Sequence, residues 1–303
     1  MQYSAYLGKA EFLKELRHEL QGHIVAEHGN LLIADVQIHP AFAIDIWPDL
    51  QTVTFESINH AAKLLRQHGH VWFHYPISHV RRGTLIQEQM RKLPALKAVP
   101  FPPPALPKIG VFTLLDQNTM IYCAKPWKAM PTGVYQFQED KVSPPNRAYL
   151  KLWEALSVSD EYPKTSEVCM DLGASPGGWT WVLQQLGADV IAVDKAPLAP
   201  NIAKLPRINE LQQSAFALDF NALPDIDWLV CDIACYPDKL LQQVQRWIDS
   251  GKVRRIISTI KLQGETDFIA IAEFQKLPNA EVLHLWHNKH ELTFFWQVNQ
   301  RGK

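Results

Sequence analysis

The chain has 303 residues, of which 47% are hydrophobic and 20% are charged. This length and composition are typical of a globular protein of about two domains and exclude a disordered or fibrous chain. The 30 lysines and arginines nearly balance the 31 aspartates and glutamates, so a polyanion such as a nucleic acid can be held only by a local basic patch.

The cysteines and the N-terminal residues indicate a reducing, cytoplasmic compartment. The four cysteines form no C-x-x-C pair, which disfavours a disulfide framework and a zinc site. No histidine pair has the spacing of metal ligands on a helix, so we expect no bound metal. The chain begins without a basic segment that leads into an apolar one, and no apolar run reaches 18 residues. We therefore expect neither export nor insertion into a membrane.

Residues 1–140 predict a smaller α+β domain of undefined topology. Apolar spacing predicts two helices and two short strands in its first half. The helices are expected at residues 9–20 and 57–68, and the strands at 31–38 and 71–75.

A proline-rich segment follows these elements. Residues 94–107 contain six prolines, which predict an extended connector because each proline removes a backbone donor and restricts the preceding residue. The stretch 81–108 also contains six basic residues against the single acid Glu88; they are Arg81, Arg82, Arg91, Lys92, Lys97 and Lys108. A solvated linker and an RNA-contacting surface explain this excess of positive charge equally well.

Residues 141–303 predict an α/β domain. Apolar runs alternate with helical segments there, which indicates parallel strands with helices on both faces. The runs are Val168–Leu172, Asp189–Asp194, Trp228–Ile233, Arg255–Leu262 and Glu281–His287. A last strand, Leu292–Val298, follows after a short turn, which favours antiparallel pairing. The predicted fold is Rossmann-like, with a mostly parallel sheet and an antiparallel last strand.

The first of these strands ends in a glycine-rich loop, DLGASPGGW, at residues 171–179. Doubly wound sheets bind nucleotides at this position. The G-x-x-x-G-G spacing, with Pro176 inside it, differs from the G-x-G-x-x-G of dinucleotide-binding proteins, so an oxidoreductase is the weaker alternative. Taken alone, the loop is also compatible with a simple tight turn between strand and helix.

Two carboxylates complete a site of the size of adenosine. Asp194 ends the second strand, where a carboxylate can accept hydrogen bonds from both hydroxyls of a ribose. Asp219 ends the segment 214–219 and can reach an adenine amino group. Because no phosphate-binding lysine accompanies them, the site suits S-adenosylmethionine better than ATP.

The loop resembles the cofactor loop of the FtsJ-like ribose 2′-O-methyltransferases, and within that family the chain most resembles the RlmM type, which modifies large-subunit ribosomal RNA. The resemblance extends from about residue 145 to the C-terminus through separated blocks at residues 146–152, 171–179, 228–232, 260–262 and 287–293. It implies an S-adenosylmethionine site formed by Asp171, Gly173, Ala174, Ser175, Pro176, Gly177, Gly178, Trp179, Asp194, Asp219 and Asp232. Trp179 is expected to contact the cofactor through its backbone. Upstream of residue 110 the resemblance ends, so the RNA-binding THUMP module of RlmM-type proteins is shorter here or replaced.

The resemblance also implies a catalytic tetrad, Lys151, Asp232, Lys261 and Glu291, that transfers a methyl group to a ribose 2′-hydroxyl of RNA. Lys261 is the candidate general base. A lysine amine, with a pKa of about 10.4 in water, can take a proton only where desolvation and a second cation, here Lys151, lower that pKa. The two carboxylates oppose such a shift, and we assign them to orienting the lysines and the hydroxyl.

One further function remains open besides the oxidoreductase: an RNA adaptor that binds the cofactor without activity. Such an adaptor is expected to lose part of the tetrad, whereas all four matching residues are present. The sequence makes no prediction about the oligomeric state.

Overall fold

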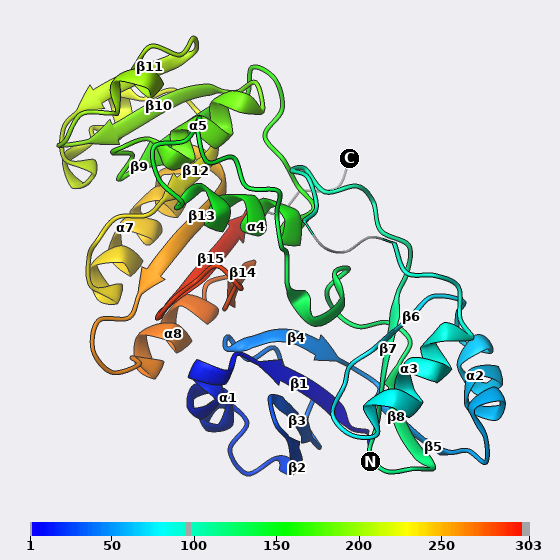
Figure 1. The fold of residues 1–303 in the computed structure, drawn as a ribbon. Helices are drawn as coiled ribbons and strands as arrows, with labels where there is room; N and C mark the ends of the chain where they lie inside the picture. The colour runs from blue at the N-terminus through cyan, green and yellow to red at the C-terminus, as the bar shows by residue number, and fades with distance from the viewer. Residues whose placement is uncertain (1, 95–97, 299–303) are drawn as a thin grey trace, which may run out of the picture. The chain divides into compact units, whose positions relative to one another are not determined.

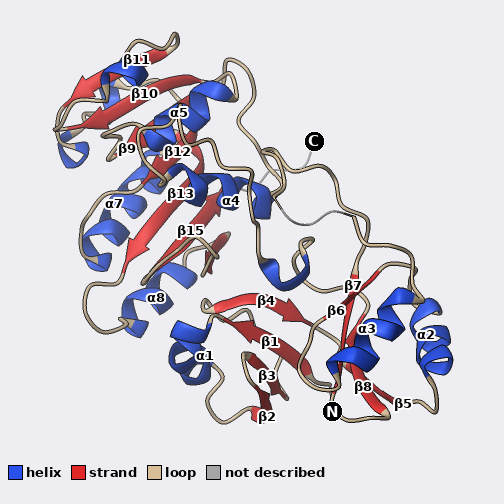
Figure 2. Cartoon of the chain, in the orientation of Figure 1, coloured by secondary structure: helices blue, strands red, loops and turns tan. Residues whose placement is uncertain are grey.

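The computed structural model describes residues 2–94 and 98–298 of the chain. Its contacts divide the chain into two compact units, Met1–Gln138 and Glu139–Lys303. Figures 1 and 2 show that each unit has its own sheets and helices. Among the described residues, no helix has the length and the apolar character needed to cross a membrane.

The first sheet of the N-terminal unit has the strand order β2-β3-β1-β4 and is antiparallel throughout. Its strands are β1 (Ser4–Gly8), β2 (Ile24–His28), β3 (Leu31–Ala34) and β4 (Ala43–Trp47). The 3-10 helix η1 (Ala10–Phe12) and helix α1 (Leu13–Glu19) connect β1 to β2. Every residue of β1, β3 and β4 is buried, so these strands lack the alternation of a half-exposed strand.

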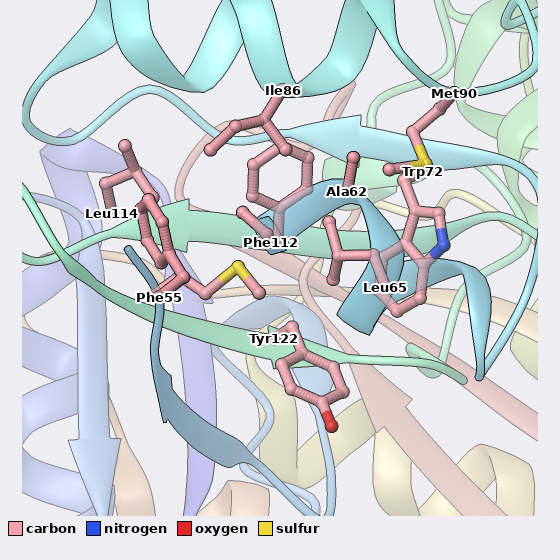
Figure 3. Packing of buried hydrophobic residues seen from close by; sticks show 11 residues of the cluster. Phe55, Ala62, Leu65, Trp72, Ile86, Met90, Phe112, Leu114 and Tyr122 are labelled. Atoms are coloured by element: carbon pink, nitrogen blue, oxygen red, sulfur yellow. The ribbon is translucent and has the colours of Figure 1, made fainter. Parts of the chain in front are cut away.

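The second sheet of this unit has the order β5-β8-β7-β6, in which only β6 and β7 pair in parallel. Its elements are β5 (Gln51–Thr54), α2 (Ile58–Arg66), β6 (Trp72–His74), α3 (Val80–Glu88), β7 (Gly110–Leu114), β8 (Thr119–Cys123) and the 3-10 helix η2 (Pro131–Gly133). Figure 3 shows the core of this part, in which Trp72 and Phe112 pack with Leu65. Helix α3 lies so close to β6 that a Cβ at Gly83 would be 2.1 Å from Nε2 of His74.

The structure corrects several expectations for this unit. The strand expected at 31–38 ends at Ala34, and the helix expected at 9–20 consists of η1 and α1. Strands β1, β4 and β7 were not expected because their buried residues show no period of two. The described residues of the proline-rich segment contain no helix, and Val99 forms a parallel bridge with Phe137.

The C-terminal unit contains one seven-stranded sheet of order β11-β10-β9-β12-β13-β15-β14. Its strands are β9 (Val168–Leu172), β10 (Asp189–Asp194), β11 (Ile208–Gln212), β12 (Ile226–Cys231), β13 (Val253–Lys261), β14 (Ala280–Leu283) and β15 (Glu291–Gln297). The strands from β11 to β13 pair in parallel, whereas β15 is antiparallel to both of its neighbours. The predicted α/β fold with an antiparallel last strand, next to an N-terminal α+β part, is thus confirmed.

The strand order of this sheet reverses direction between β9 and β12. From β9 the chain first moves outward through β10 to β11, and then returns to the other side of β9 to form β12 and β13. The helices of the unit are α4 (Tyr149–Ser159), α5 (Gly178–Gln185), α6 (Pro200–Ala203), η3 (Ala215–Ala217), η4 (Phe220–Ala222), α7 (Pro237–Ser250) and α8 (Phe268–Gln275). Because crossovers between parallel strands are right-handed, α5 and α7 lie on opposite faces. The loops after β9 and β12 therefore meet at the switch point where such sheets bind ligands.

Two features of this sheet differ from the expectation. Strand β11 was missed because it lies at the edge, and its polar residues, among them Asn209 and Glu210, hide its strand character. The strand expected at 281–287 ends at Leu283, and residues 284–290 form a turn. After this turn β15 does not simply extend the edge: it inserts between β13 and β14.

Candidate active site

The glycine-rich loop joins β9 to α5 at the switch point. Gly173 and Gly177 have φ angles of +82° and +114°, a conformation that favours glycine. A Cβ at Gly177 would also lie 2.7 Å from Cγ2 of Ile202. Both the backbone angle and the close packing therefore require glycine at position 177.

Asp194, the last residue of β10, holds the loop in place. One carboxylate oxygen accepts a hydrogen bond from the Ser175 backbone N–H at 3.1 Å, and the other accepts from Ala196 N–H at 3.0 Å. Each oxygen keeps a second lone pair with which it can accept a ligand hydroxyl. Asp194 is half-buried, so it can both shape the loop and face a ligand at the end of the sheet.

The other face of the loop packs against the segment before α4. The indole N–H of Trp179 donates to the carbonyl of Ala148 at 2.9 Å, and the side chain of Trp179 is buried. Asn146 accepts from Ala148 N–H, and its Oδ1 lies 2.6 Å from the position of a Cβ at Gly178. Asn146 thus supports the loop. The sequence analysis did not assign it this role, although it lies in a block that resembles the family.

The four tetrad residues come from four different elements and meet at one end of the sheet. Lys151 lies in α4, Asp232 follows β12, Lys261 ends β13 and Glu291 begins β15. Because β15 is antiparallel to β13, its first residue is the register partner of the last residue of β13, so Glu291 lies opposite Lys261.

Three ion pairs connect these side chains. Lys151 Nζ lies 3.0 Å from Asp232 Oδ2 and 3.0 Å from Glu291 Oε1. Lys261 Nζ lies 3.1 Å from Asp232 Oδ1 and donates to the Asp232 carbonyl at 2.9 Å. Asp232 is thus shared by both lysines, and the cluster has no net charge.

The two lysines differ in their surroundings. Burial by itself lowers the pKa of Lys151, but attraction and hydrogen bonds from Asp232 and Glu291 together outweigh burial and raise it. Lys151 is therefore held as an ammonium ion. In the described part of the chain Lys261 pairs with Asp232 alone, and its side chain is 27% exposed against 14% for Lys151. Lys261 is the lysine that an incoming molecule can reach.

Asp219 has a different environment from the other predicted site residues. It is exposed, and its Oδ1 accepts from Asn221 N–H at the start of η4. The segment 214–219 before it forms η3 and is not a strand. None of the hydrogen bonds of Asp219 to described residues links it to the glycine-rich loop or to the tetrad.

Asp171 is a buried carboxylate beneath the loop. Its Oδ2 accepts from the Thr180 hydroxyl at 2.7 Å, while Oδ1 has no hydrogen-bond partner among the described residues. Burial raises the pKa of Asp171 to about 7; the Thr180 bond opposes this shift, and the nearby charges of Asp232 and Asp194 add to it. An unpartnered buried oxygen is costly, which makes Oδ1 a candidate acceptor for a ligand donor.

Sequence reasoning missed a second buried carboxylate, Glu154. It lies one turn after Lys151 in α4 and is fully buried. It accepts hydrogen bonds from the backbone N–H groups of Trp286 and His287 and contacts the His287 ring. The available signal was a single acid inside the otherwise apolar run Leu152–Leu156, since a charge is rarely buried without partners.

The raised pKa of Asp171 predicts that protein stability depends on pH. A carboxyl whose folded-state pKa lies near 7, above its ordinary value of about 3.8, contributes stability that is fully present below about pH 3.8 and is lost progressively as the pH rises from there to about 7. Asp171→Asn keeps an acceptor for Thr180 and cannot ionise. We expect its melting temperature, relative to the original protein, to be higher at pH 8 than at pH 5 by at least about 3 °C.

Differential scanning fluorimetry of the protein without cofactor measures this difference. Asp219→Asn, at an exposed carboxylate, is the control and should give the same difference at both pH values. An equal effect of Asp171→Asn at pH 5 and pH 8 would contradict a neutral carboxyl at this position.

Comparisons with known proteins agree with the geometry of this unit. The model of the FtsJ-like methyltransferase family matches residues 144–291. The proteins named ribosomal RNA large subunit methyltransferase M from Halorhodospira halophila and Alkalilimnicola ehrlichii are each 31% identical to the chain, over 178 and 182 residues. These matches cover 56% of this chain, and 52% and 49% of the two relatives, respectively.

A relative of the same name from Azoarcus sp. is 29% identical over 189 residues, which are 57% of this chain and 50% of that protein. The chain thus spans about half the length of the curated relatives it matches. The family model begins just before α4 and ends at Glu291, so it includes the loop and all four tetrad residues. The resemblance seen in the sequence is confirmed: residues 144–291 match the FtsJ-like methyltransferase family.

Proposed function

We propose that the protein is an S-adenosylmethionine-dependent methyltransferase that acts on a ribose 2′-hydroxyl of RNA, with large-subunit ribosomal RNA as the substrate. The observation that carries this proposal is the cluster of Lys151, Asp232, Lys261 and Glu291 within ion-pair distance. It lies at the end of the sheet from which the glycine-rich loop also emerges. The curated relatives, which are named as ribosomal RNA methyltransferases, support the choice of RNA.

The residues around the loop fit S-adenosylmethionine. The backbone of residues 173–178 and the carboxylate of Asp194 would hold the adenosine part, and Asp171 Oδ1, which has no partner among the described residues, would accept from a donor of the cofactor. Asp232 would face its positively charged amino group and sulfonium. When bound, S-adenosylmethionine supplies an electrophilic methyl group. The carboxylate of Asp232 close to the positive groups of the cofactor would be favourable, because electrostatic attraction strengthens where water is excluded.

Asp219 is the weakest part of the proposed cofactor site. Its exposure is compatible with a contact to the adenine amino group, but its Oδ1 already caps η4. We keep Asp219 as a proposed contact that reaches the adenine through its second oxygen.

Lys261 would take the proton of the attacking hydroxyl. Lys151 is a poor candidate for this role, because two carboxylates hold its proton. By pairing with Asp232, Lys151 also offsets part of the negative charge of the carboxylate that Lys261 contacts. Glu291 and Asp232 would orient the two lysines and the hydroxyl.

The alternatives receive less support. A cofactor-binding adaptor without activity has no need for four half-buried ionised groups that cost free energy to bring together. An oxidoreductase would be expected to bind a dinucleotide, and the family model that matches this chain is that of a methyltransferase.

Exposed basic residues of the N-terminal unit would bind the RNA backbone. Arg81, Arg91, Lys92 and Lys108 are exposed. The guanidinium of Arg82 lies 5.3 Å from the ring centre of Phe55, so Arg82 serves packing at least in part. Lys97 lies outside the described residues. Because phosphate contacts need positive charge, these side chains are the proposed RNA surface.

The base assignment predicts that Lys261→Ala and Lys261→Arg both abolish methyl transfer. Arginine keeps the positive charge but does not release its proton at any working pH, so it cannot act as a base. We expect single-turnover rates on RNA at saturating cofactor to fall by at least about 100-fold, with cofactor affinity unchanged within about twofold. Lys276→Ala, at an exposed lysine of the same unit, is the control. Substantial activity of Lys261→Arg would leave Lys261 as an orienting cation.

The cofactor assignment predicts that Asp194→Ala weakens binding of S-adenosylmethionine. Loss of hydrogen bonds to a charged group costs about 1.5–3 kcal/mol, which corresponds to roughly 10- to 150-fold in Kd. Isothermal titration calorimetry measures the change. Asp249→Ala, near the far end of α7, is the matched control. An unchanged Kd in Asp194→Ala would move the ribose site away from β10.

The proposed RNA surface predicts a change in salt dependence. Arg91→Ala and Lys92→Ala should each weaken RNA binding and reduce the slope of log K against log salt concentration by about 0.7–0.9 for each phosphate that is no longer neutralised. Lys14→Ala, at an exposed lysine of α1, should leave the slope unchanged. Filter-binding titrations at several salt concentrations test this, and an unchanged slope in both variants would identify the stretch as a solvated surface.

A further inference from the structure

Glu154 is the one member of α4 whose charge the proposed chemistry does not use. Its side chain is fully buried in a helix whose neighbouring residues Trp153 and Ala155 are buried and apolar. Removing a carboxylate from water without partners costs several kcal/mol. Its position three residues after Lys151 places the two side chains one helical turn apart.

Among the described residues, the hydrogen-bond partners of the Glu154 carboxylate lie in the turn between β14 and β15. Oε1 accepts from Trp286 N–H at 2.7 Å, and Oε2 accepts from His287 N–H at 2.8 Å. The Nδ1 atom of the same His287 lies 2.6 Å from Oε2. An ionised carboxylate only accepts, so Nδ1 carries the hydrogen of this bond. The carboxylate thus holds two consecutive amides and a side chain of one short turn.

The rest of this turn is also fixed by hydrogen bonds. Asn288 and Thr293 are buried and bond to each other through their side chains. The backbone N–H of Leu262 donates to the carbonyl of His290 at 3.2 Å, which joins the turn to the residue after Lys261. Because these bonds fix the residues between His287 and Glu291, we expect a displacement at Trp286 or His287 to change the position of Glu291.

We propose that Glu154 is a positioning residue for the tetrad. It fixes the 284–290 turn to α4, and so brings Glu291, at the end of the turn, to Lys151 on the same helix. The 3.0 Å contact between Lys151 and Glu291 then depends on a second carboxylate that touches none of the reacting atoms. This role rests on the proposed function, because the tetrad is the group whose geometry Glu154 is inferred to set.

The first test compares Glu154→Gln with Glu161→Gln. Glutamine has one acceptor oxygen and an NH₂ group that donates, so it cannot accept from all three donors of the turn. Glu161 also pairs with a cation, Arg255, but near the start of β13, at the opposite end of that strand from Lys261. The two variants thus remove the same charge from two places in the unit.

Three measurements are made on variants of the 303-residue chain. Hydrogen exchange followed by mass spectrometry reports on the amides of residues 284–290 without any need for activity. Single-turnover methyl transfer at saturating S-adenosylmethionine and RNA reports on the tetrad, and calorimetry gives the cofactor Kd. For Glu154→Gln we expect faster exchange in this peptide and a rate at least about tenfold lower, as expected when reacting groups are misplaced, with Kd unchanged within about twofold. Glu161→Gln should change none of these.

A second pair of variants applies if Glu154→Gln does not fold. His287→Ala removes the side-chain donor to Glu154, whereas the side-chain amide of His287→Asn can still donate from nearly the same place. We expect His287→Ala to slow methyl transfer and His287→Asn to restore at least half of the lost rate. A role in stability alone would let His287→Asn restore the melting temperature that His287→Ala loses, but it would leave the single-turnover rate of the folded protein unchanged in both variants.

The outcomes separate the two proposals. If the original protein transfers no methyl group to RNA, the proposed function fails, and hydrogen exchange still decides whether Glu154 fixes the turn. Unchanged exchange and an unchanged rate in Glu154→Gln would overturn the positioning role. A loss of cofactor affinity as large as the loss of rate would also overturn it, because the effect would then extend beyond the tetrad.

Discussion

Electroneutrality of a half-buried cluster constrains the whole C-terminal unit. Two lysines and two carboxylates meet where side chains are only 13–27% exposed, and removal of any one would leave an uncompensated charge. Each of the four comes from a different element, so the requirement for neutrality fixes α4, β12, β13 and β15 relative to one another. The order of the sheet and the antiparallel direction of β15 bring the four side chains to the same end of the sheet, and the turn held by Glu154 is proposed to position Glu291.

The glycine-rich loop obeys a different constraint, that of backbone conformation. Gly177 needs a left-handed φ and leaves no room for a Cβ beside Ile202, while Asp194 satisfies the Ser175 amide. These contacts shape the backbone at the end of the sheet and involve no titratable cluster. Asp171 is linked both to the helix that follows the loop and to the tetrad. Its buried carboxylate accepts a hydrogen bond from Thr180, and the charge of Asp232 contributes to its raised pKa. The proposed cofactor-binding and proton-transfer groups thus share one end of the sheet, and Asp232 belongs to both.

The N-terminal unit is organised by burial and contributes positive charge at its surface. Its two sheets share apolar residues in one core that includes Trp47 and Val111. The buried carboxylate of Asp45 and the half-buried carboxylate of Glu19 have pKa values raised to about 7 chiefly by desolvation. The exposed basic residues of the proposed RNA surface lie in and after α3. A chain with a net charge of −1 can bind RNA only if such charges are concentrated locally, which gives this surface its proposed role.

The sequence by itself determined the elements whose signal is local. The alternation of strands and helices after residue 141 and the glycine-rich loop follow from short stretches in which spacing or a motif is sufficient. The tetrad residues were proposed from separated blocks that resemble the family. Tertiary structure alone decided the pairings between distant segments. Nothing local in β15 indicates that it inserts between β13 and β14, and nothing local in Leu152–Leu156 tells which amides Glu154 will accept. The buried strands β1 and β4 were missed for the same reason. A strand that is covered on both faces, or a charge that is neutralised by residues more than a hundred positions away, obtains its stability from partners that the local sequence does not contain.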